Sequence, residues 1–406
     1  MKVDHVTSMA EVPADSAIFD GSHLYSGHAW LSFCERHDYS RPHHLVGRDD
    51  QGRILGMLPA YEISKEGHPR YRPGEALAGT LPESAHPDSR WFPGLVLGAR
   101  TGNRNGLLDG TGPAAERTRV LGGLLDEALA LAREQERRAL WYLYLDAAEA
   151  SRLRAAWPRA MPHFIDFELV IPVPESYEAY LARLNKLQRR NVGRERKAFA
   201  ESSPELVRVP YDEDICPAIA PLLAKLQAKH GMPRTVEWLT ERLRRQAVAM
   251  AGAGEVILLR RDGRLVAFVL MLRHGTGLYC ISVGIDYELA ARNDYFNITY
   301  YEPLKVALEK GLTSMHVGMG TAEAKLRRGA VPVPLWGLTE TLGPAADIRR
   351  EEVDHRNGRR LAEAREWCAA RVQQPIDDLL WRTPDAATSD AADPAVRTSP
   401  ATGGKS

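Results

Sequence analysis

The chain has 406 residues, too many for one typical hydrophobic core and about right for two domains followed by a tail. Lys+Arg and Asp+Glu are equal at 53 each, which excludes an overall polycation and limits any nucleic-acid contact to a local basic patch. The four cysteines lie far apart and no apolar run reaches about 18 residues, so we predict a cytoplasmic protein without disulfides, metal site or membrane span.

The first half of the chain opens with a predicted β-hairpin. The pattern of His44–Tyr61 predicts a strand, a turn and a strand, and Gly52 supplies the positive φ that a tight turn needs. The elements predicted after it are a loop over 103–106, a helix over Ala114–Glu136 and a strand over Leu140–Leu145. This order predicts a sheet with a long amphipathic helix packed against it.

A basic segment separates the two halves. The apolar residues of Glu175–Glu201 fall near helical spacing, which predicts a helix that breaks or kinks at Gly193. Within fifteen of its residues, seven are Lys or Arg and only Glu195 is acidic. Such an excess suits phosphates, whose neutralisation makes binding salt-dependent; the alternative is a charged face that contacts only water. The cations that we expect to bind the donor substrate are Lys186, Arg189, Arg190 and Arg194.

The second half repeats the order of the first. A helix over Ala218–His230 ends at Gly231, and a second hairpin follows over Val256–Leu272 with its turn at Asp262–Gly263. The elements predicted after it are a strand over Leu278–Val283, a loop over 291–294, a helix over Tyr300–Lys310 and a strand over Ser314–Gly318. This repeat predicts an α/β (α+β) fold of two tandem GNAT-like (acetyltransferase-type) domains, each a mixed β-sheet flanked by helices.

The predicted domain boundaries follow from this repeat. Residues 1–165 form an N-terminal GNAT-like domain, and residues 166–382 form a C-terminal one that carries the basic helix at 176–201. Residues 383–406 are predicted to be a disordered tail. Their Ala, Thr, Ser, Pro, Asp and Gly side chains bury too little apolar area to offset the entropy lost on ordering.

Three stretches of the sequence resemble one family. They are LARLNKLQRRNVGRERKAF (181–199), AKLQAKHGMPRTVEWLTERL (224–243), and 293–332 with its Tyr-Tyr helix and Gly…Lys-x-x-Arg-Gly turn. Their order and spacing over about 177–334 resemble the Fem-type and related peptidoglycan-biosynthesis-like acyltransferases of the GNAT superfamily. The first domain resembles the family mainly in its HAWLSFCE helix.

The resemblance implies an aminoacyltransferase. Such an enzyme moves an amino acid from aminoacyl-tRNA, its co-substrate, to an amine of a small molecule or peptide, and forms an amide bond without a further cofactor. The long coiled-coil arm of the cell-wall members has no counterpart in this sequence, which favours specialised, antibiotic-type metabolism. Two alternatives stay open: an N-acyltransferase that uses acyl-CoA or an acyl carrier protein, and a non-catalytic binding protein with the same fold.

The loop before the central helix bears on the acyl-CoA alternative. Enzymes of the superfamily that use acetyl-CoA bind its phosphates with a glycine-rich turn at this place, because glycines let backbone N–H groups approach closely. Here Arg292–Asn297 puts bulky side chains at both glycine positions, and Asp294 adds an anion. Acyl-CoA is therefore a poor donor for the second domain. Arg292 joins the predicted donor-binding cations, and Gly110–Gly112 is a weaker phosphate candidate in the first domain.

Lys325 is the leading catalytic candidate, since it matches the lysine of the family's Lys-x-x-Arg-Gly turn. A fixed cation favours the charge that grows on the carbonyl oxygen when an amine attacks an ester; binding a donor phosphate is the alternative role. The other predicted catalytic residues are Arg328 and Glu302. The predicted acceptor pocket comprises Tyr300, Tyr301, Asp294 and Trp336. The general base stays open among Glu302, Asp294, His316, Glu323 and Tyr301.

Overall fold

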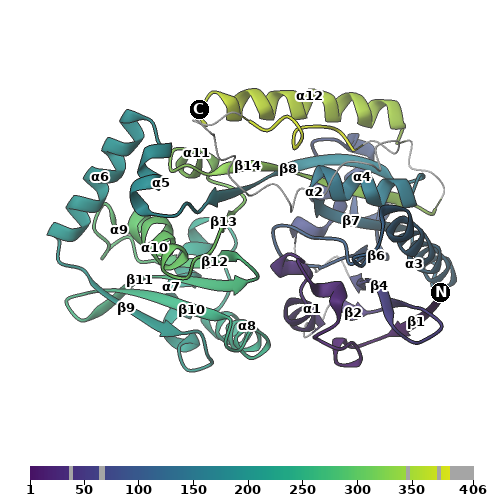
Figure 1. Ribbon diagram of the computed structural model, residues 1–406, viewed down its shortest axis with the longest axis horizontal. Coiled ribbons are helices and arrows are strands. Elements are labelled where there is room, and N and C mark those ends of the chain that lie inside the picture. The colour runs from purple at the N-terminus through teal and green to yellow at the C-terminus, as the bar shows by residue number, and fades with distance from the viewer. Residues whose placement is uncertain (36–39, 64–68, 344–347, 373–375, 385–406) are drawn as a thin grey trace, which may run out of the picture. The chain divides into compact units, whose positions relative to one another are not determined.

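A computed structural model describes residues 1–35, 40–63, 69–343, 348–372 and 376–384 (Figure 1). The chain divides into two compact units. The first comprises Met1–Asp166, Pro334–Arg365 and the residues from Asp377 onward, and the second comprises Phe167–Val333 and Glu366–Ile376. The chain therefore leaves the first unit next to the predicted boundary, but it also returns at Pro334 and leaves again at Glu366.

The first unit contains two sheets. The smaller is antiparallel with the order β1-β3-β4, formed by β1 (Lys2–Val6), β3 (His44–Arg48) and β4 (Ile54–Leu58). Strands β3 and β4 confirm the first predicted hairpin, and Gly52 in its turn has φ 78°. The strand order of the larger sheet is β2 (Ser40–Pro42), β5 (Ala60–Ile63), β6 (Gly94–Leu97), β7 (Ala139–Leu145) and β14 (Val331–Thr341).

Helices cover these strands and close the first core. They are α1 (His28–Glu35), α2 (Pro73–Ala76), α3 (Ala114–Glu134), α4 (Ala147–Ala156) and α12 (Arg350–Ala369), whose last turn belongs to the second unit. Short 3-10 turns occupy Met9–Glu11, Ala17–Phe19, Leu24–Ser26, Pro69–Tyr71, Glu83–Ala85 and Asp88–Arg90. Four indoles are among the largest fully buried side chains of this core, namely Trp30, Trp91, Trp141 and Trp336.

The second unit contains one mixed sheet. Its strand order is β8 (Met161–Pro172), β13 (Ser314–Gly318), β12 (Gly277–Ile285), β11 (Arg264–His274), β10 (Gly254–Arg261) and β9 (Glu205–Pro210). Strands β10 and β11 confirm the second predicted hairpin, which Asp262 and Gly263 close with φ 49° and 71°. The helices are α5 (Tyr177–Arg183), α6 (Lys186–Glu201), α7 (Cys216–Lys229), α8 (Val236–Ala249), α9 (Asp294–Phe296), a π-helical turn (Asn297–Tyr301), α10 (Glu302–Glu309) and α11 (Ala322–Leu326).

The strand pairings confirm the internal repeat. In each unit a parallel strand pair flanks the central helix: β6 and β7 with α3 in the first, β12 and β13 with α10 in the second. A short helix and one more antiparallel strand follow each copy. Residues 169–172 of β8 pair with β13 in the second unit, and residues 336–341 of β14 pair with β7 in the first. Each copy therefore supplies its last strand to the sheet of the other unit, which explains the repeated crossings of the chain.

The basic segment differs from its prediction. It forms two helices, α5 and α6, which separate at Leu184–Asn185. The Asn185 side chain accepts a hydrogen bond from the Gln188 N–H at 2.7 Å and thereby caps α6. Gly193 lies inside the continuous helix α6, so the predicted break there is wrong. One glycine costs a helix only about 1 kcal/mol, which the packing of α6 overcomes.

Across the residues that the structure describes, no helix combines the length and the apolar character needed to cross a bilayer. The tail predicted to be disordered begins at residue 383, and its residues from 385 onward lie outside the described residues.

Candidate functional site

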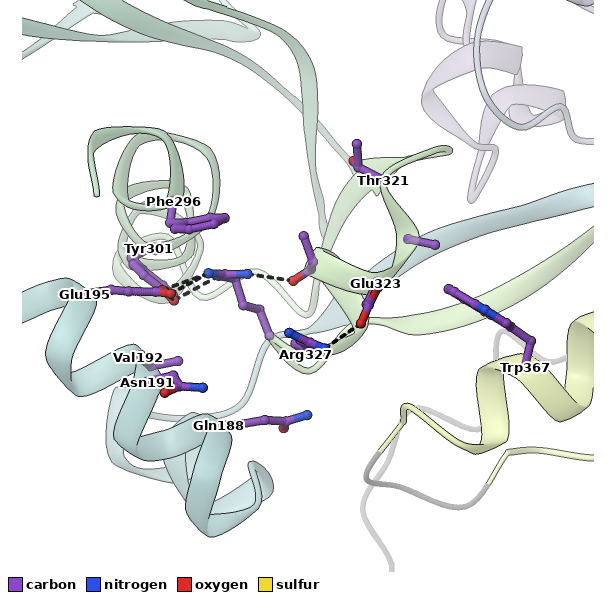
Figure 2. Close-up of a pocket in the computed structure, with 13 residues that line it drawn as sticks. Gln188, Asn191, Val192, Glu195, Phe296, Tyr301, Thr321, Glu323, Arg327 and Trp367 are labelled. Carbon is purple, nitrogen blue, oxygen red and sulfur yellow. Dashed lines mark hydrogen bonds and ion pairs between the residues drawn. The ribbon is translucent and has the colours of Figure 1, made fainter. Parts of the chain in front are cut away.

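The second unit contains a cavity of about 600 Å³ (Figure 2). One wall is a face of α6, where Gln188, Asn191, Val192 and Glu195 follow one another at spacings of three and four residues. Residues with this spacing share one side of a helix. The N-terminal cap of α6 therefore helps to fix the position of this wall.

The opposite wall is the segment that follows β13. Thr321, Ala322, Glu323 and Ala324 line the cavity together with Arg327, Arg328, Phe296, Tyr301 and Trp367. The chain reaches this wall through a turn in which Gly318 and Gly320 have φ 68° and 75° and Thr321 has φ 43°. A left-handed conformation is rare for a β-branched residue, so the surrounding contacts hold this turn in a defined shape.

Arg328 forms the centre of the site. Its Nη2 donates to both carboxylate oxygens of Glu195 at 2.8 Å, and its Nε donates to the Tyr301 hydroxyl at 2.9 Å. Its Nη1 donates to the Ala324 carbonyl at 2.9 Å, and its guanidinium carbon lies 3.7 Å from the centre of the Phe296 ring. Only 6% of Arg328 is exposed. The charge is therefore buried, paired and bonded on every nitrogen.

The same network joins three elements of the second unit. Glu195 belongs to α6, Tyr301 ends the π-helical turn, and Arg328 follows α11. The Tyr301 hydroxyl also donates to Glu195, and the labelled side chains of Glu195 and Tyr301 meet in Figure 2. Burial raises the pKa of Tyr301 far above its ordinary value, so this hydroxyl stays protonated at neutral pH. The network fixes the cavity walls relative to one another.

Lys325 does not line the cavity. It is 5% exposed, and its Nζ donates to the carbonyls of Gly318 at 3.1 Å and Met319 at 3.0 Å. Burial raises the pKa of the Cys280 thiol to about 12, and the positive charge of Lys325 partly offsets that rise, which places the ammonium near Cys280. The geometry thus gives Lys325 the task of holding the turn after β13, instead of contact with a substrate.

The variant Lys325→Met is expected to lower the stability of the protein. The change removes two hydrogen bonds from a charged donor and leaves two buried carbonyls without it, at a cost of about 2–3 kcal/mol. Urea unfolding followed by circular dichroism measures this loss. The matched control is Lys2→Met, whose side chain is 81% exposed. Equal midpoints for both variants would contradict the structural role of Lys325.

Glu302 and Asp294 are also turned away from the cavity. Glu302 accepts hydrogen bonds from Arg196 Nη1 at 2.5 Å and Lys305 Nζ at 3.1 Å. Asp294 is fully buried and accepts from Arg261 Nε and the Ala291 N–H, each at 2.8 Å. The expectation that Asp294 presents a free anion is wrong, because Arg261 neutralises it.

Side chains fill the loop that would have to cradle coenzyme phosphates. Asn297 is fully buried, accepts a hydrogen bond from Arg196 Nη1 at 2.9 Å and donates to the Asn293 carbonyl at 2.9 Å. Arg292 is exposed beside them. The backbone N–H groups of this loop therefore have bulky, bonded neighbours where a glycine turn would leave space.

Of the predicted acceptor pocket, only Tyr301 lines the cavity. Tyr300 is 1% exposed and lies behind the wall, with the Arg328 guanidinium 5.3 Å from its ring centre. Trp336 belongs to the core of the first unit, where its ring packs edge-on against Phe164 at 5.6 Å. The structure therefore does not bring Tyr300, Asp294 or Trp336 into one pocket with Tyr301.

The remaining base candidates, His316 and Glu323, occupy different environments. His316 is buried, stacks on Tyr279 with ring centres 4.1 Å apart, and has its Nδ1 3.2 Å from Glu168 Oε1. It is a core residue of β13, outside the cavity lining. Glu323 lines the cavity and accepts a hydrogen bond from Arg327.

Four of the predicted donor-binding cations lie on α6, and none of them lines the cavity. Lys186, Arg189, Arg190 and Arg194 are all exposed on α6. Lys186, Arg190, Arg194 and Lys197 recur at spacings of three and four residues, so they form a stripe, here called the basic face. Helical geometry puts this face opposite the one that lines the cavity. The two faces of α6 thus carry different chemistry.

The glycines of the first unit do not form a phosphate cradle. A Cβ atom at Gly112 would lie 2.8 Å from the Glu116 carboxylate, and one at Gly110 would lie 2.4 Å from the Leu55 carbonyl. Both neighbours are oxygen acceptors, which repel an anion. The phosphate site that the sequence allowed at Gly110–Gly112 therefore has unsuitable surroundings.

Glu149 is a buried carboxyl group of the first unit with a raised pKa. Burial, and then the nearby charge of Asp146, raise its pKa from 4.5 to about 7, while Arg104 and Arg152 partly offset the rise. Its Oε1 accepts a hydrogen bond from the Leu107 N–H at 3.1 Å. Because the folded state binds the proton more tightly than the unfolded chain, Glu149 stabilises the fold at low pH. This contribution is lost as pH rises from about 4.5 through about 7.

The variant Glu149→Gln is therefore expected to be more stable than the native chain at pH 8 but not at pH 5. The amide keeps the hydrogen bond to Leu107 and removes the charge, and a shift of this size corresponds to about 3 kcal/mol at most. Urea unfolding at both pH values measures the difference. Glu134→Gln, at an exposed position of α3, is the control. A stability difference that does not change with pH would contradict the assignment.

Several cavity residues escaped prediction from the sequence. Gln188, Glu195, Phe296 and Trp367 line it without having been singled out as site residues. Glu195 could have been noticed, since it is the only acid in residues 183–197, which hold seven cations. No sequence pattern marked Trp367, because this residue belongs to the second unit only through the final turn of α12.

Comparisons with known proteins agree with this architecture. Residues 14–349 match the FemAB-like family of peptidoglycan biosynthesis/recognition proteins. The crystal structure of FemX superposes with a TM-score of 0.56 at 12% identity, covering 84% of this chain and 98% of FemX. A conserved protein of unknown function from Bacteroides thetaiotaomicron VPI-5482 gives 0.50 at 13% identity, covering 84% of this chain and 100% of the other. A tandem GNAT protein from the clavulanic acid biosynthesis pathway gives 0.48 at 11% identity, covering 85% and 100%.

At these identities, the structural likenesses show a shared fold. No curated protein sequence gives a significant match. With the repeated strand order, the comparisons confirm the predicted α/β fold of two tandem GNAT-like domains and the predicted resemblance to Fem-type transferases.

Proposed function

The chain belongs to the FemAB-like family, and we propose that it transfers an amino acid from aminoacyl-tRNA to an amine, as its resemblance to the Fem-type acyltransferases implies. The acceptor is a small molecule or a peptide, the product is an amide, and the setting is specialised metabolism in the cytoplasm. The cavity of the second unit is the reaction site.

One observation supports this proposal most: one face of α6 lines the cavity, and the opposite face is exposed and basic. One face lines a cavity with a buried, fully bonded Arg328–Glu195 pair. The other exposes the basic face, Lys186, Arg190, Arg194 and Lys197, to solvent. A polyanionic carrier can bind the exposed cations while its acyl end enters the cavity. The filled loop at Asn293–Asn297 disfavours coenzyme A in the same unit.

The residues of the cavity suit the attack of an amine on an ester. The amine nitrogen bonds to the carbonyl carbon and the ester C–O bond breaks. The one proton that the neutral amine loses ends on the 3′ oxygen of the tRNA, which leaves as a hydroxyl. Glu195 lines the cavity, so its carboxylate can accept this proton and pass it on. Arg328 orients Glu195 through two hydrogen bonds to its carboxylate.

The test compares donors directly. The purified full chain is incubated with an amine mixture and either a pool of charged tRNA, acyl-CoA or an acyl carrier protein. Amide products are then identified by mass spectrometry. The proposal predicts transfer from charged tRNA that RNase abolishes. Transfer that resists RNase and requires acyl-CoA or the carrier protein would show that the donor is one of these and not charged tRNA. No transfer from any donor would favour a binding protein.

A further inference from the structure

Gln188 is a polar residue of the cavity wall whose chemistry the network around Arg328 does not use. It is 7% exposed, and Figure 2 shows its side chain reaching from α6 toward the cavity. Its Oε1 is shielded from water and accepts no hydrogen bond from any residue in the described ranges. A buried amide oxygen without a donor destabilises the fold, so such a residue calls for an explanation.

The neighbours of Gln188 limit what can satisfy it. The two guanidinium groups of the lining are engaged, Arg328 with Glu195 and Arg327 with Glu323. Neither guanidinium group is available to Gln188, and a ligand in the cavity can supply the donor. Rotation about the last side-chain bond of Gln188 is soft, so its oxygen can turn toward a ligand in the cavity. The carboxylate oxygens of Glu195 and Glu323 in the same lining are further acceptors, which suits a ligand group with several N–H donors.

We propose that Gln188 makes the cavity selective for ligands with a primary amine, its side-chain oxygen accepting a hydrogen bond from the amine N–H. The inference rests on the proposed function and names a group that the substrates must present. Phe296, Trp367 and Val192 give the cavity apolar surfaces for the body of such a ligand. Two sources supply the amine: the acceptor, and the α-amino group of the transferred amino acid.

Two small probes test the selectivity without any transfer. Phenylalaninamide and 3-phenylpropanamide differ by the α-amino group alone, and their affinities are measured by ligand-observed NMR titration of the full chain. The native protein is expected to prefer phenylalaninamide by about tenfold, which corresponds to about 1.4 kcal/mol. Gln188→Leu is expected to bind both probes equally. The same variant is expected to melt at a higher temperature, since leucine removes an unsatisfied buried oxygen.

Gln246→Leu is the matched control. Gln246 is a fully buried glutamine outside the cavity, and its Oε1 accepts a hydrogen bond from Tyr211 at 3.1 Å. Its replacement is expected to leave the tenfold preference intact. The inference is overturned if the native chain binds the two probes equally, if Gln188→Leu keeps the preference, or if Gln188→Leu melts at a lower temperature than the native chain.

Steady-state transfer distinguishes the two sources of the amine. A higher KM for the amine acceptor in Gln188→Leu, with kcat unchanged, assigns Gln188 to the acceptor. A higher KM for the charged tRNA in Gln188→Leu assigns Gln188 to the donor. In that case, acetylating the α-amino group of the charged tRNA is expected to raise its KM for the native chain by the same amount. A chain that prefers phenylalaninamide but transfers nothing would refute the proposed function and leave the selectivity of Gln188 standing.

Discussion

The variant Arg328→Ala is expected to lose transfer activity and about 3–5 kcal/mol of stability. Arg328 and Glu195 have side chains only 8% and 18% exposed, and removing one partner leaves the other charge buried without compensation. The Tyr301 hydroxyl loses its donor at the same time. Urea unfolding measures the stability, and the amide product formed from charged tRNA measures the activity.

Two further variants separate folding from activity. Arg327→Ala is the matched control, since this side chain is 63% exposed and pairs with Glu323 at the same wall; it is expected to change stability by less than about 1 kcal/mol. The double variant Arg328→Met with Glu195→Gln removes both charges, so it is expected to fold better than Arg328→Ala while staying inactive. Full activity in either Arg328 variant would show that the pair has no part in the reaction.

Reversing the charge of the basic face is expected to weaken tRNA binding at least a hundredfold at low salt. The triple variant replaces Lys186, Arg190 and Arg194 with Glu, all three at exposed positions of α6. Each cation that neutralises a phosphate contributes about 0.7–0.9 to the slope of log affinity against log salt, so this slope is expected to fall by about 2 to 3. Filter binding of a tRNA pool between about 50 and 200 mM salt measures both quantities.

The control reverses three cations on the first unit. Lys2, Arg53 and Arg119 have side chains 81%, 73% and 78% exposed, so their replacement by Glu changes the net charge equally. This control is expected to bind tRNA within about threefold of the native chain. Equal weakening in both triple variants would mean that overall charge, not the basic face, governs binding.

Local elements were predictable from the sequence because their signals are local. Gly52 and Gly263 mark the two hairpins, and both have the positive φ that such turns require. The predicted strand Ser314–Gly318 coincides with β13. The predicted helix over Ala114–Glu136 corresponds to α3, which ends two residues earlier than predicted. The order of these elements sufficed for the tandem fold.

The composition of the site was far less predictable. Arg328 and Glu195 are 133 residues apart in the chain, and no local pattern announces their pairing. Lys325 stood out by its motif, yet its ammonium donates hydrogen bonds to two carbonyls of the preceding turn. Trp336 follows the motif closely in sequence but belongs to the other unit, because β14 crosses between them. Long-range packing decided each of these cases.

Hydrogen–deuterium exchange tests the central claim most directly. The claim is that α6 and the cavity beside it receive an anionic carrier, and that the loop at Asn293–Asn297 is not a coenzyme A cradle. Uncharged tRNA is predicted to slow exchange of the amides of α6 (Lys186–Glu201), and coenzyme A is predicted to leave the amides of 293–297 unchanged. Protection of 293–297 by coenzyme A, with no protection of α6 by tRNA, would contradict the account.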